Sequence, residues 1–331
     1  MNKEETHMKK FLSLLLALTM LLTSACALAD AAWPDGTVQL IVAAKAGGGT
    51  DLIARIIAEK MSEIAGKPVV VVNQTEGNGA IAFDTVMNDD DAALNVGFFI
   101  PSFMTAYITG STDMDPLKDY QVASFLDCTD SNYFVVRNDS PFNTMEEVIA
   151  YAKENPGKLS LGLSLGSRTH FTVAEFAQAA GIEFKYVEAG KAADQTTALL
   201  GGHIDITLLN VANTQQYVLS GDMKALATTA TPYEADEKLM AVPTLADLGY
   251  EGLKCKADFF FMTSNEASAE TLEAINAIVT ETMADATVNE NIVKLGYLLT
   301  PNDIATSAEK FAVCYNTFDQ VGEQLGIKYE R

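Results

Sequence analysis

Apolar positions along this chain fall into two kinds of segment, which alternate. Continuous apolar runs of strand length occupy residues 38–43, 68–73 and 94–100. The stretches between them carry apolar residues at the i, i+3, i+4 spacing of a helix face. This order predicts a βαβαβ unit, in which helices cover the faces of a parallel sheet.

The pattern changes near residue 122. It predicts further strands at residues 159–163, 184–187, 204–209 and 225–229, with helices over residues 144–155, 169–180 and 192–200. A strand at residues 258–263 returns towards the first unit, and helices follow over residues 269–284, 289–295 and 307–325.

We therefore predict an α/β protein of two lobes, each lobe a mainly parallel sheet flanked by helices. The expected first lobe comprises residues 30–124 and 256–331, and the second comprises residues 125–255. Two segments crossing between lobes form a hinge, and the cleft at the hinge is the expected ligand site.

The first candidate site is the glycine turn between the first strand and its helix, which is expected to start near Asp51. Its members are Lys45, Ala46, Gly47, Gly48, Gly49, Thr50 and Asp51. Glycines allow backbone N–H groups to approach a guest, and a helix N-terminus favours an anion. Thr50 or Asp51 is expected to cap the helix, although Asp51 could instead contact a ligand. Lys45 is either solvated or the partner of a carboxylate.

Cofactor motifs do not fit this turn. A dinucleotide fingerprint needs G-x-G-x-x-G and a P-loop needs G-K-[ST], whereas the chain reads GGGTD. The cysteines and histidines also lack metal-ligand spacing. We expect no cofactor and no metal.

A second glycine turn spans residues 162–169 and contains the formal G-x-S-x-G motif around Ser164. A serine hydrolase would also need an acid and then a histidine after the serine. The downstream histidines are His170 and His203. His170 is only six residues from Ser164, and His203 lies at the opposite end of one predicted helix from Asp194. Binding without turnover is favoured, and a secreted serine hydrolase remains the alternative. His170 either faces a ligand or satisfies a backbone carbonyl.

The N-terminus has the pattern of an export signal. Lys9 and Lys10 precede an apolar run over residues 11–22, and small residues end at Ala29. We expect residues 1–29 to be a cleaved signal peptide, with acylation of Cys26 as the competing interpretation. The protein is expected to be periplasmic or extracellular.

Charge and cysteine content narrow the possible partners. The chain carries 22 basic and 44 acidic residues, for a net charge of −22. That excess opposes binding to nucleic acid or to an anionic membrane surface, so an anion site must rely on local donors. Cys128, Cys255 and Cys314 follow the signal. Cys314 lies on an amphipathic segment and is expected to be buried.

Several ordered motifs together resemble a known family. They are Trp33-Pro34, AGGGTDLIAR, the strand at residues 68–73, the PGKL strand with its Gly-Ser turn, LLGGHIDI, MKALATTA and VPTLADLGY. The chain is similar to the extracytoplasmic receptors of tripartite tricarboxylate transporters, also called Bug receptors. The resemblance implies a two-lobed periplasmic-binding-protein-like fold, a small carboxylate ligand and integral-membrane permease subunits as partners. We also expect a monomer. A receptor that feeds a sensor protein would use the same fold.

The resemblance also implies which residues hold the carboxylate, mainly through backbone amides and water. Besides the first turn, these are Ser164, Gly166, Ser167, Arg168, Thr169, His170, Gly190, Lys191 and Asn210. The chain departs from the family pattern at Ala43-Ala44 and at residues 76–79 and 189–192, so the acid stays open among dicarboxylates, tricarboxylates, aromatic acids and acidic amino acids. The family fold further implies adjacent crossing strands, which would allow a Cys128–Cys255 bridge, with two buried thiols as the alternative.

Overall fold

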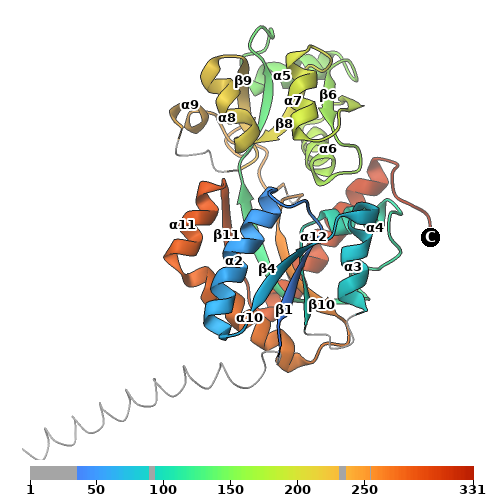
Figure 1. Ribbon diagram of the computed structural model, residues 1–331. Coiled ribbons are helices and arrows are strands. Elements are labelled where there is room, and N and C mark those ends of the chain that lie inside the picture. The colour runs from blue at the N-terminus through green and yellow to red at the C-terminus, as the bar shows by residue number, and fades with distance from the viewer. Residues whose placement is uncertain (1–35, 89–93, 231–235, 254) are drawn as a thin grey trace, which may run out of the picture.

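The computed structural model describes residues 36–88, 94–230, 236–253 and 255–331. The predictions for the signal peptide, for Cys26 and for Trp33-Pro34 lie outside the described residues. Two lobes are stacked one above the other, each with its own sheet (Figure 1). The mixed α/β, two-lobed fold predicted from the hydrophobic pattern is confirmed.

The first lobe is built from both ends of the described chain. Its N-terminal part contains β1 (Val38–Val42), α2 (Gly49–Ala65), β2 (Val69–Asn73), η1 (Glu76–Gly79), α3 (Ala80–Met87), β3 (Asn95–Phe99), α4 (Ser102–Ile108) and β4 (Tyr120–Asp130). Its C-terminal part contains β10 (Phe259–Ser264), α10 (Ala269–Ala284), α11 (Ala286–Lys294), β11 (Tyr297–Pro301) and α12 (Ile304–Gln324).

The strand order of the first sheet is β11-β4-β10-β3-β1-β2. The first four strands in sequence run in one direction, and β10 and β11 run in the other. Alternate residues of β1 enter opposite cores: Leu40 packs with α2 and α10, whereas Ile41 packs with α3 and α12. The sheet is therefore covered by helices on both faces, and its carboxyl ends form the edge that faces the second lobe (Figure 1).

The second lobe carries a five-stranded sheet of order β7-β6-β8-β5-β9, in which β5 runs against the other strands. Its elements are β5 (Asn132–Arg137), α5 (Met145–Glu154), β6 (Ser160–Leu163), α6 (Arg168–Ala180), β7 (Lys185–Glu188), α7 (Ala192–Leu200), β8 (Ile206–Asn210), α8 (Val211–Ser220), β9 (Met223–Thr228) and α9 (Glu237–Met240). The first sheet has two parallel and three antiparallel neighbouring pairs, and the second has two of each, so both sheets are more mixed than predicted.

The segment by which the chain leaves the first lobe, here called the outgoing crossing, lies later than the expected boundary at residue 125. β4 stays in the first sheet to Asp130, where it pairs with Tyr297 of β11, and β5 begins at Asn132 in the second sheet. The pairing with β11 holds β4 there, and the sequence pattern did not predict β11. The segment by which the chain comes back to the first lobe, here called the return crossing, precedes β10.

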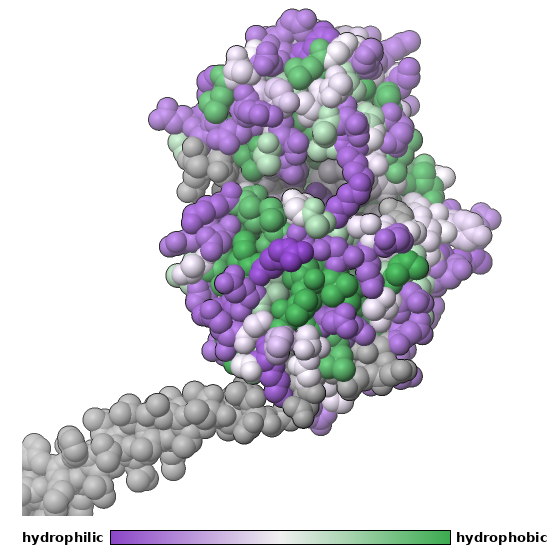
Figure 2. Space-filling model, viewed as in Figure 1, coloured by the Kyte–Doolittle hydropathy of each residue, from purple (hydrophilic) through white to green (hydrophobic). Residues whose placement is uncertain are grey.

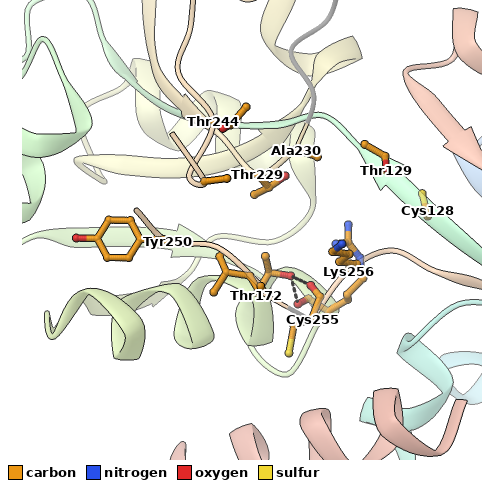
Figure 3. Close-up of a pocket in the computed structure, with 13 residues that line it drawn as sticks. Cys128, Thr129, Thr172, Thr229, Ala230, Thr244, Tyr250, Cys255 and Lys256 are labelled. Carbon is orange, nitrogen blue, oxygen red and sulfur yellow. Dashed lines mark hydrogen bonds between the residues drawn. The ribbon is translucent and has the colours of Figure 1, made fainter. Parts of the chain in front are cut away.

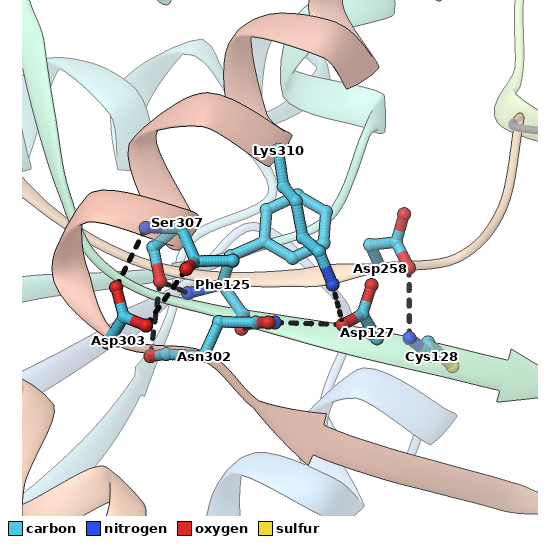
Figure 4. Close-up of polar contacts among 9 residues, drawn as sticks. Phe125, Asp127, Cys128, Asp258, Asn302, Asp303, Ser307 and Lys310 are labelled. Atoms are coloured by element: carbon cyan, nitrogen blue, oxygen red, sulfur yellow. Dashed lines mark hydrogen bonds and ion pairs between the residues drawn. The ribbon is translucent and has the colours of Figure 1, made fainter.

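Polar contacts fasten the outgoing strand to the C-terminal part of the first lobe (Figure 4). The amide of Asn302 donates to the carbonyl of Phe125 at 2.9 Å and to Asp127 at 2.8 Å. Lys310 of α12 also pairs with Asp127. The amide N–H of Cys128 donates to Asp258 at 2.9 Å, which joins the two crossings.

The lobes also touch through helices. Phe171 of α6 packs on Phe318 of α12, with ring centroids 5.3 Å apart, and both side chains are buried. α6 thus belongs to the second lobe by connectivity, but the side chains on one of its faces pack into a core of the first lobe. Any movement between the lobes must involve this contact.

Of the two alternatives for Cys128 and Cys255, the structure shows two buried thiols and no bridge between them. The three cysteines of the described residues are free and buried, as expected for Cys314. Cys128 lies in the core on one face of the first sheet, and Cys255 and Cys314 lie in the core on the other. Phe259 pairs with Leu126, so the antiparallel register places Ala257, rather than Cys255, opposite Cys128.

In the part of the chain that the structure describes, no helix combines the length and apolar character needed to cross a membrane.

Candidate functional site

The first glycine turn is held from within by Asp51. Its side chain is only 2% exposed, and its carboxylate accepts from the amide of Gly47 at 2.7 Å and from Asn73 at 2.9 Å. Arg55 completes the cluster, with Nη2 at 2.9 Å. Burial alone would raise the pKa of Asp51, but the hydrogen bonds from Arg55, Gly47 and Asn73 outweigh it and lower the pKa.

This geometry corrects the predicted cap. Gly48 is the N-cap of α2, with extended backbone angles and no side-chain cap, and the helix begins at Gly49. Asp51 lies inside the first turn and reaches back to the amide of Gly47. It shapes the turn instead of capping the helix, because its oxygens are already occupied.

The second glycine turn begins α6. Ser167 is the N-cap, and its hydroxyl accepts from the amide of His170. Gly166 has a φ of 75°, the left-handed region that glycine tolerates. The amide of Gly166 donates to Nδ1 of His170 at 3.1 Å. His170 therefore holds a backbone amide, not the carbonyl that the sequence-based alternative named.

That hydrogen bond fixes the chemistry of His170. With Nδ1 accepting, the neutral ring carries its proton on Nε2, which is buried and has no hydrogen-bond partner among the described residues. Burial lowers the pKa of His170, although Glu188 opposes part of that effect. A neutral histidine with an unused donor thus stands beside the second turn.

A cavity of about 700 Å³ lies between this turn and α4 of the first lobe. Predicted site residues that line it are Ser164, Gly166, Ser167, Arg168, Thr169, His170, Lys191 and Asn210. Side chains that the sequence analysis missed also line it, namely Ser102, Thr105, Thr109, Ser111, Asn132, Gln195 and Ile327. We call this the interlobe cavity. Figure 2 shows the surface hollowed between the two lobes.

Three helices of the second lobe begin at the interlobe cavity. Ser167, Lys191 and Asn210 are the N-caps of α6, α7 and α8 respectively, and all three line it. The first N–H groups of a helix have no carbonyl partner within that helix, and the N-terminus carries a partial positive charge. Three such ends at one cavity, with Arg168 and Lys191 beside them, favour an anionic guest.

Some nearby amides are already bound to the chain's own carboxylates. Glu188 accepts from the amide of Leu165 at 2.7 Å and from that of Gly190 at 2.9 Å. Asp194 accepts from the amide of Lys191 at 3.2 Å. Gly190, predicted to contact the ligand, is accordingly not among the lining residues, and its loop is tied to the second turn through Glu188.

The predicted residues of the first turn also stand outside this cavity. Lys45, Ala46 and Gly47 are exposed at the carboxyl end of β1, and Gly48 and Thr50 are partly exposed. None of them is among the lining residues. The turn nevertheless faces the second lobe (Figure 1).

One of the missed groups had a usable signal in the sequence. α4 follows the carboxyl end of β3, where open α/β sheets bind ligands, so the strand-end rule could have pointed to it. Asn132 pairs in register with Asn210, but that register is a tertiary fact. Ile327 lies near the end of the chain and gave no signal.

Among the described residues, no histidine is placed to activate Ser164. Nδ1 of His170 holds Gly166, and Nε2 has no partner among the described residues, so neither nitrogen activates the serine. Asp194 lies in the first turn of α7 and His203 follows its far end, about 13 Å along a helix of this length. Within the described residues, no cluster of three potential metal ligands occurs.

Two α/β lobes joined by two crossings, with an anion-favouring cavity between them, define the class of bilobed ligand-binding proteins. The family model described as the tripartite tricarboxylate transporter family receptor matches residues 53–310. The chain belongs to that family, as its motifs indicated, and the family is one of solute-binding receptors.

One relative is similar to this chain in sequence, and two solved structures are similar to it in fold. A Cupriavidus necator protein described as a UPF0065 protein in the gbd 5' region is 34% identical over 223 residues, which is 66% of this chain and 65% of that protein. The periplasmic binding protein BugD has a TM-score of 0.70 at 22% identity, over 90% of this chain and 100% of its own. An R. palustris protein solved with adipate has a TM-score of 0.72 at 23% identity, over 89% of this chain and 99% of its own.

Proposed function

We propose that this protein is an exported receptor that captures a small carboxylate in the interlobe cavity, without turnover, and delivers it to a tripartite transporter permease. The observation that carries the proposal is the meeting of three helix N-termini at one cavity. Because the chain has a net charge of −22, only such local donors can attract an anion.

The donors present suit a carboxylate. Ser167 and Thr169 supply hydroxyls, Arg168 and Lys191 supply positive charge, and His170 supplies a buried Nε2 donor if the ligand reaches it. The adipate held by the R. palustris relative supports this ligand class. The comparison supports the class of small carboxylates and not a long dicarboxylate in particular, because the residues that line this cavity belong to this chain and not to the relative.

The first glycine turn completes the site when the lobes close. Lys45 and the amide of Ala46 are the groups that would then meet the ligand from the first lobe, since the amide of Gly48 donates to the carbonyl of Lys45. The support is their exposure at the edge that faces the second lobe. Asp51 acts indirectly by holding the turn in shape.

A thermal-shift screen of organic acids tests the binding step. A true ligand at 100 times its dissociation constant stabilises the folded state by about 2.7 kcal/mol. Hits are then titrated against Ala192→Trp, which fills the interlobe cavity, and against Ala193→Trp, an exposed neighbour on the same helix. Loss of binding in the first variant alone supports the site.

Two outcomes would contradict the proposal. Equal affinity in both tryptophan variants would move the ligand elsewhere. Ester hydrolysis that disappears in Ser164→Ala would make the protein an enzyme instead.

Delivery and export need separate measurements. Uptake of the identified acid by cells that contain the permease subunits should require this receptor, whereas a sensing role would leave uptake unchanged. The mass of the mature N-terminus distinguishes cleavage after Ala29 from acylation at Cys26. Sedimentation tests the proposal that the receptor acts as a monomer.

A further inference from the structure

A second cavity, of about 420 Å³, lies at the hinge. Its walls come from the end of β4, from α6, from the segment after β9 and from residues 244–253 and 255–256, so it touches both crossings. In Figure 3 the labelled residues surround an open space, with Cys128 and Thr129 on one side and Tyr250 on the other. The volume falls within the range of small-molecule sites. We call this the hinge cavity.

The charge of the hinge cavity contrasts with that of the chain. Among the described residues that line it, Arg168 and Lys256 are basic and none is acidic. Lys256 is exposed and makes no ion pair with another described residue. In a protein with twice as many acidic as basic residues, two cations among the described lining residues form a local attraction for an anion.

The remaining lining divides into hydroxyls and apolar groups. Thr129, Thr229 and Thr244 place hydroxyl-bearing side chains around the space, and Tyr250 and Leu253 supply a ring and an aliphatic side chain. A guest that matches this lining has one anionic end and a compact apolar body. An inorganic ion would leave the apolar wall uncovered, and a dianion of extended shape would have to place its second charge there.

We propose that the hinge cavity is a second ligand site, for a small monocarboxylate with an aromatic or branched apolar body. Its carboxylate lies between Arg168 and Lys256, and its apolar body lies against Tyr250 and Leu253. This site is separate from the interlobe cavity, although Arg168 lines both.

α6 connects the two sites mechanically. Its first turn borders the interlobe cavity at Ser167, while Thr172, one turn later, donates to the carbonyl of Cys255 at 2.5 Å (Figure 3). Glu175 accepts from the amide of the same cysteine at 2.8 Å. A guest at the return crossing therefore pushes on the helix that presents the second turn.

The consequence is a coupling between sites, which rests on the proposed function of the interlobe cavity. A guest in the hinge cavity contacts both crossings and changes the free energy of lobe closure. By linkage, each ligand then changes the affinity of the other by the same factor.

The test uses 4-bromobenzoate as the probe, because bromine can be located by anomalous scattering in soaked crystals. The expected bromine position is in the hinge cavity, with saturable binding in solution calorimetry. Lys256→Glu should weaken the probe by about tenfold or more. Lys294→Glu makes the same charge change at an exposed site on α11 and should leave affinity within about twofold.

Two tryptophan variants separate the cavities. Ala246→Trp fills the hinge cavity and should abolish probe binding, whereas Ala192→Trp fills the interlobe cavity and should leave it intact. Bromine found only in the interlobe cavity, density without saturable binding in solution, or full affinity in Ala246→Trp would each overturn the second site.

Coupling has its own readout. The affinity of the acid identified for the interlobe cavity should change when 4-bromobenzoate saturates the wild-type protein, and should not change in Ala246→Trp. If no acid binds the interlobe cavity, the proposed function fails while the bromine position still decides the hinge site. An unchanged affinity in the wild-type protein would refute the coupling alone.

Discussion

Asp51 offers the sharpest test of how the first glycine turn is built. The change Asp51→Asn keeps the size of the side chain and one carbonyl oxygen, but it removes the charge and replaces one acceptor with a donor. One oxygen of Asp51 accepts from the amide of Gly47, and the other accepts from Asn73. Whichever way the new amide is turned, one of these two donors loses its partner.

The magnitude follows from those contacts. A buried donor left without an acceptor costs about 1–3 kcal/mol. The ion pair with Arg55, whose side chain is 50% exposed, adds less than about 1 kcal/mol because solvent screens it. We expect Asp51→Asn to lower the free energy of unfolding by about 2–4 kcal/mol near neutral pH.

The effect should depend on pH with a defined sign. The pKa of Asp51 is lowered in the folded protein, because hydrogen bonds to the carboxylate outweigh the opposing effect of burial. The carboxylate therefore stabilises fully above the unfolded pKa of about 3.9, and that contribution is lost as pH falls through the folded pKa. The gap between wild type and variant should narrow below about pH 4.

Urea unfolding followed by circular dichroism measures the difference in unfolding free energy between wild type and Asp51→Asn, at neutral pH and at a series of acidic pH values. Glu59→Gln is the matched control, since Glu59 is an exposed carboxylate on the same helix and its loss should change stability by less than about 0.5 kcal/mol. If Asp51→Asn matched that control, or if its deficit persisted unchanged under acidic conditions, the reasoning about the turn would be refuted.

Three further predictions follow from single residues. The pKa of His170, measured by NMR, should lie below the usual value of about 6.5, because burial lowers it. The unfolded chain then binds more protons, so this group should make the free energy of unfolding rise with pH up to about 6.5. A normal pKa for the ring would contradict its burial. Lys45→Ala should weaken carboxylate binding by about 1–3 kcal/mol in calorimetry, and unchanged affinity in a folded variant would place Lys45 in solvent. Cys128, Cys255 and Cys314 should resist iodoacetamide in the native protein and all react after denaturation without reductant, as read by mass spectrometry; any cysteine protected after denaturation would indicate a bridge.

Local pattern determined much of this protein. The bounds predicted for α10 agree with the structure at residues 269–284. Both glycine turns precede helices as expected, although α2 starts slightly earlier. These features depend on the spacing of apolar residues and on glycine within a few positions, which a single sequence displays directly.

Tertiary structure decided the details of the site. The sequence marked amides at Gly47 and Gly190 as ligand donors, but Asp51 and Glu188 occupy them. The far wall of the interlobe cavity comes from α4 and Ile327, which no motif connected to the second turn.

The same limit separates the cysteines. Cys128 and Cys255 flank adjacent crossings, yet Ala257 is the residue opposite Cys128. Cys255 precedes β10 and lies outside any strand, with its side chain in the other core. Periodicity reports which face of its own element a residue occupies. It carries no information on register between strands far apart in the chain, and register decides which side chains meet.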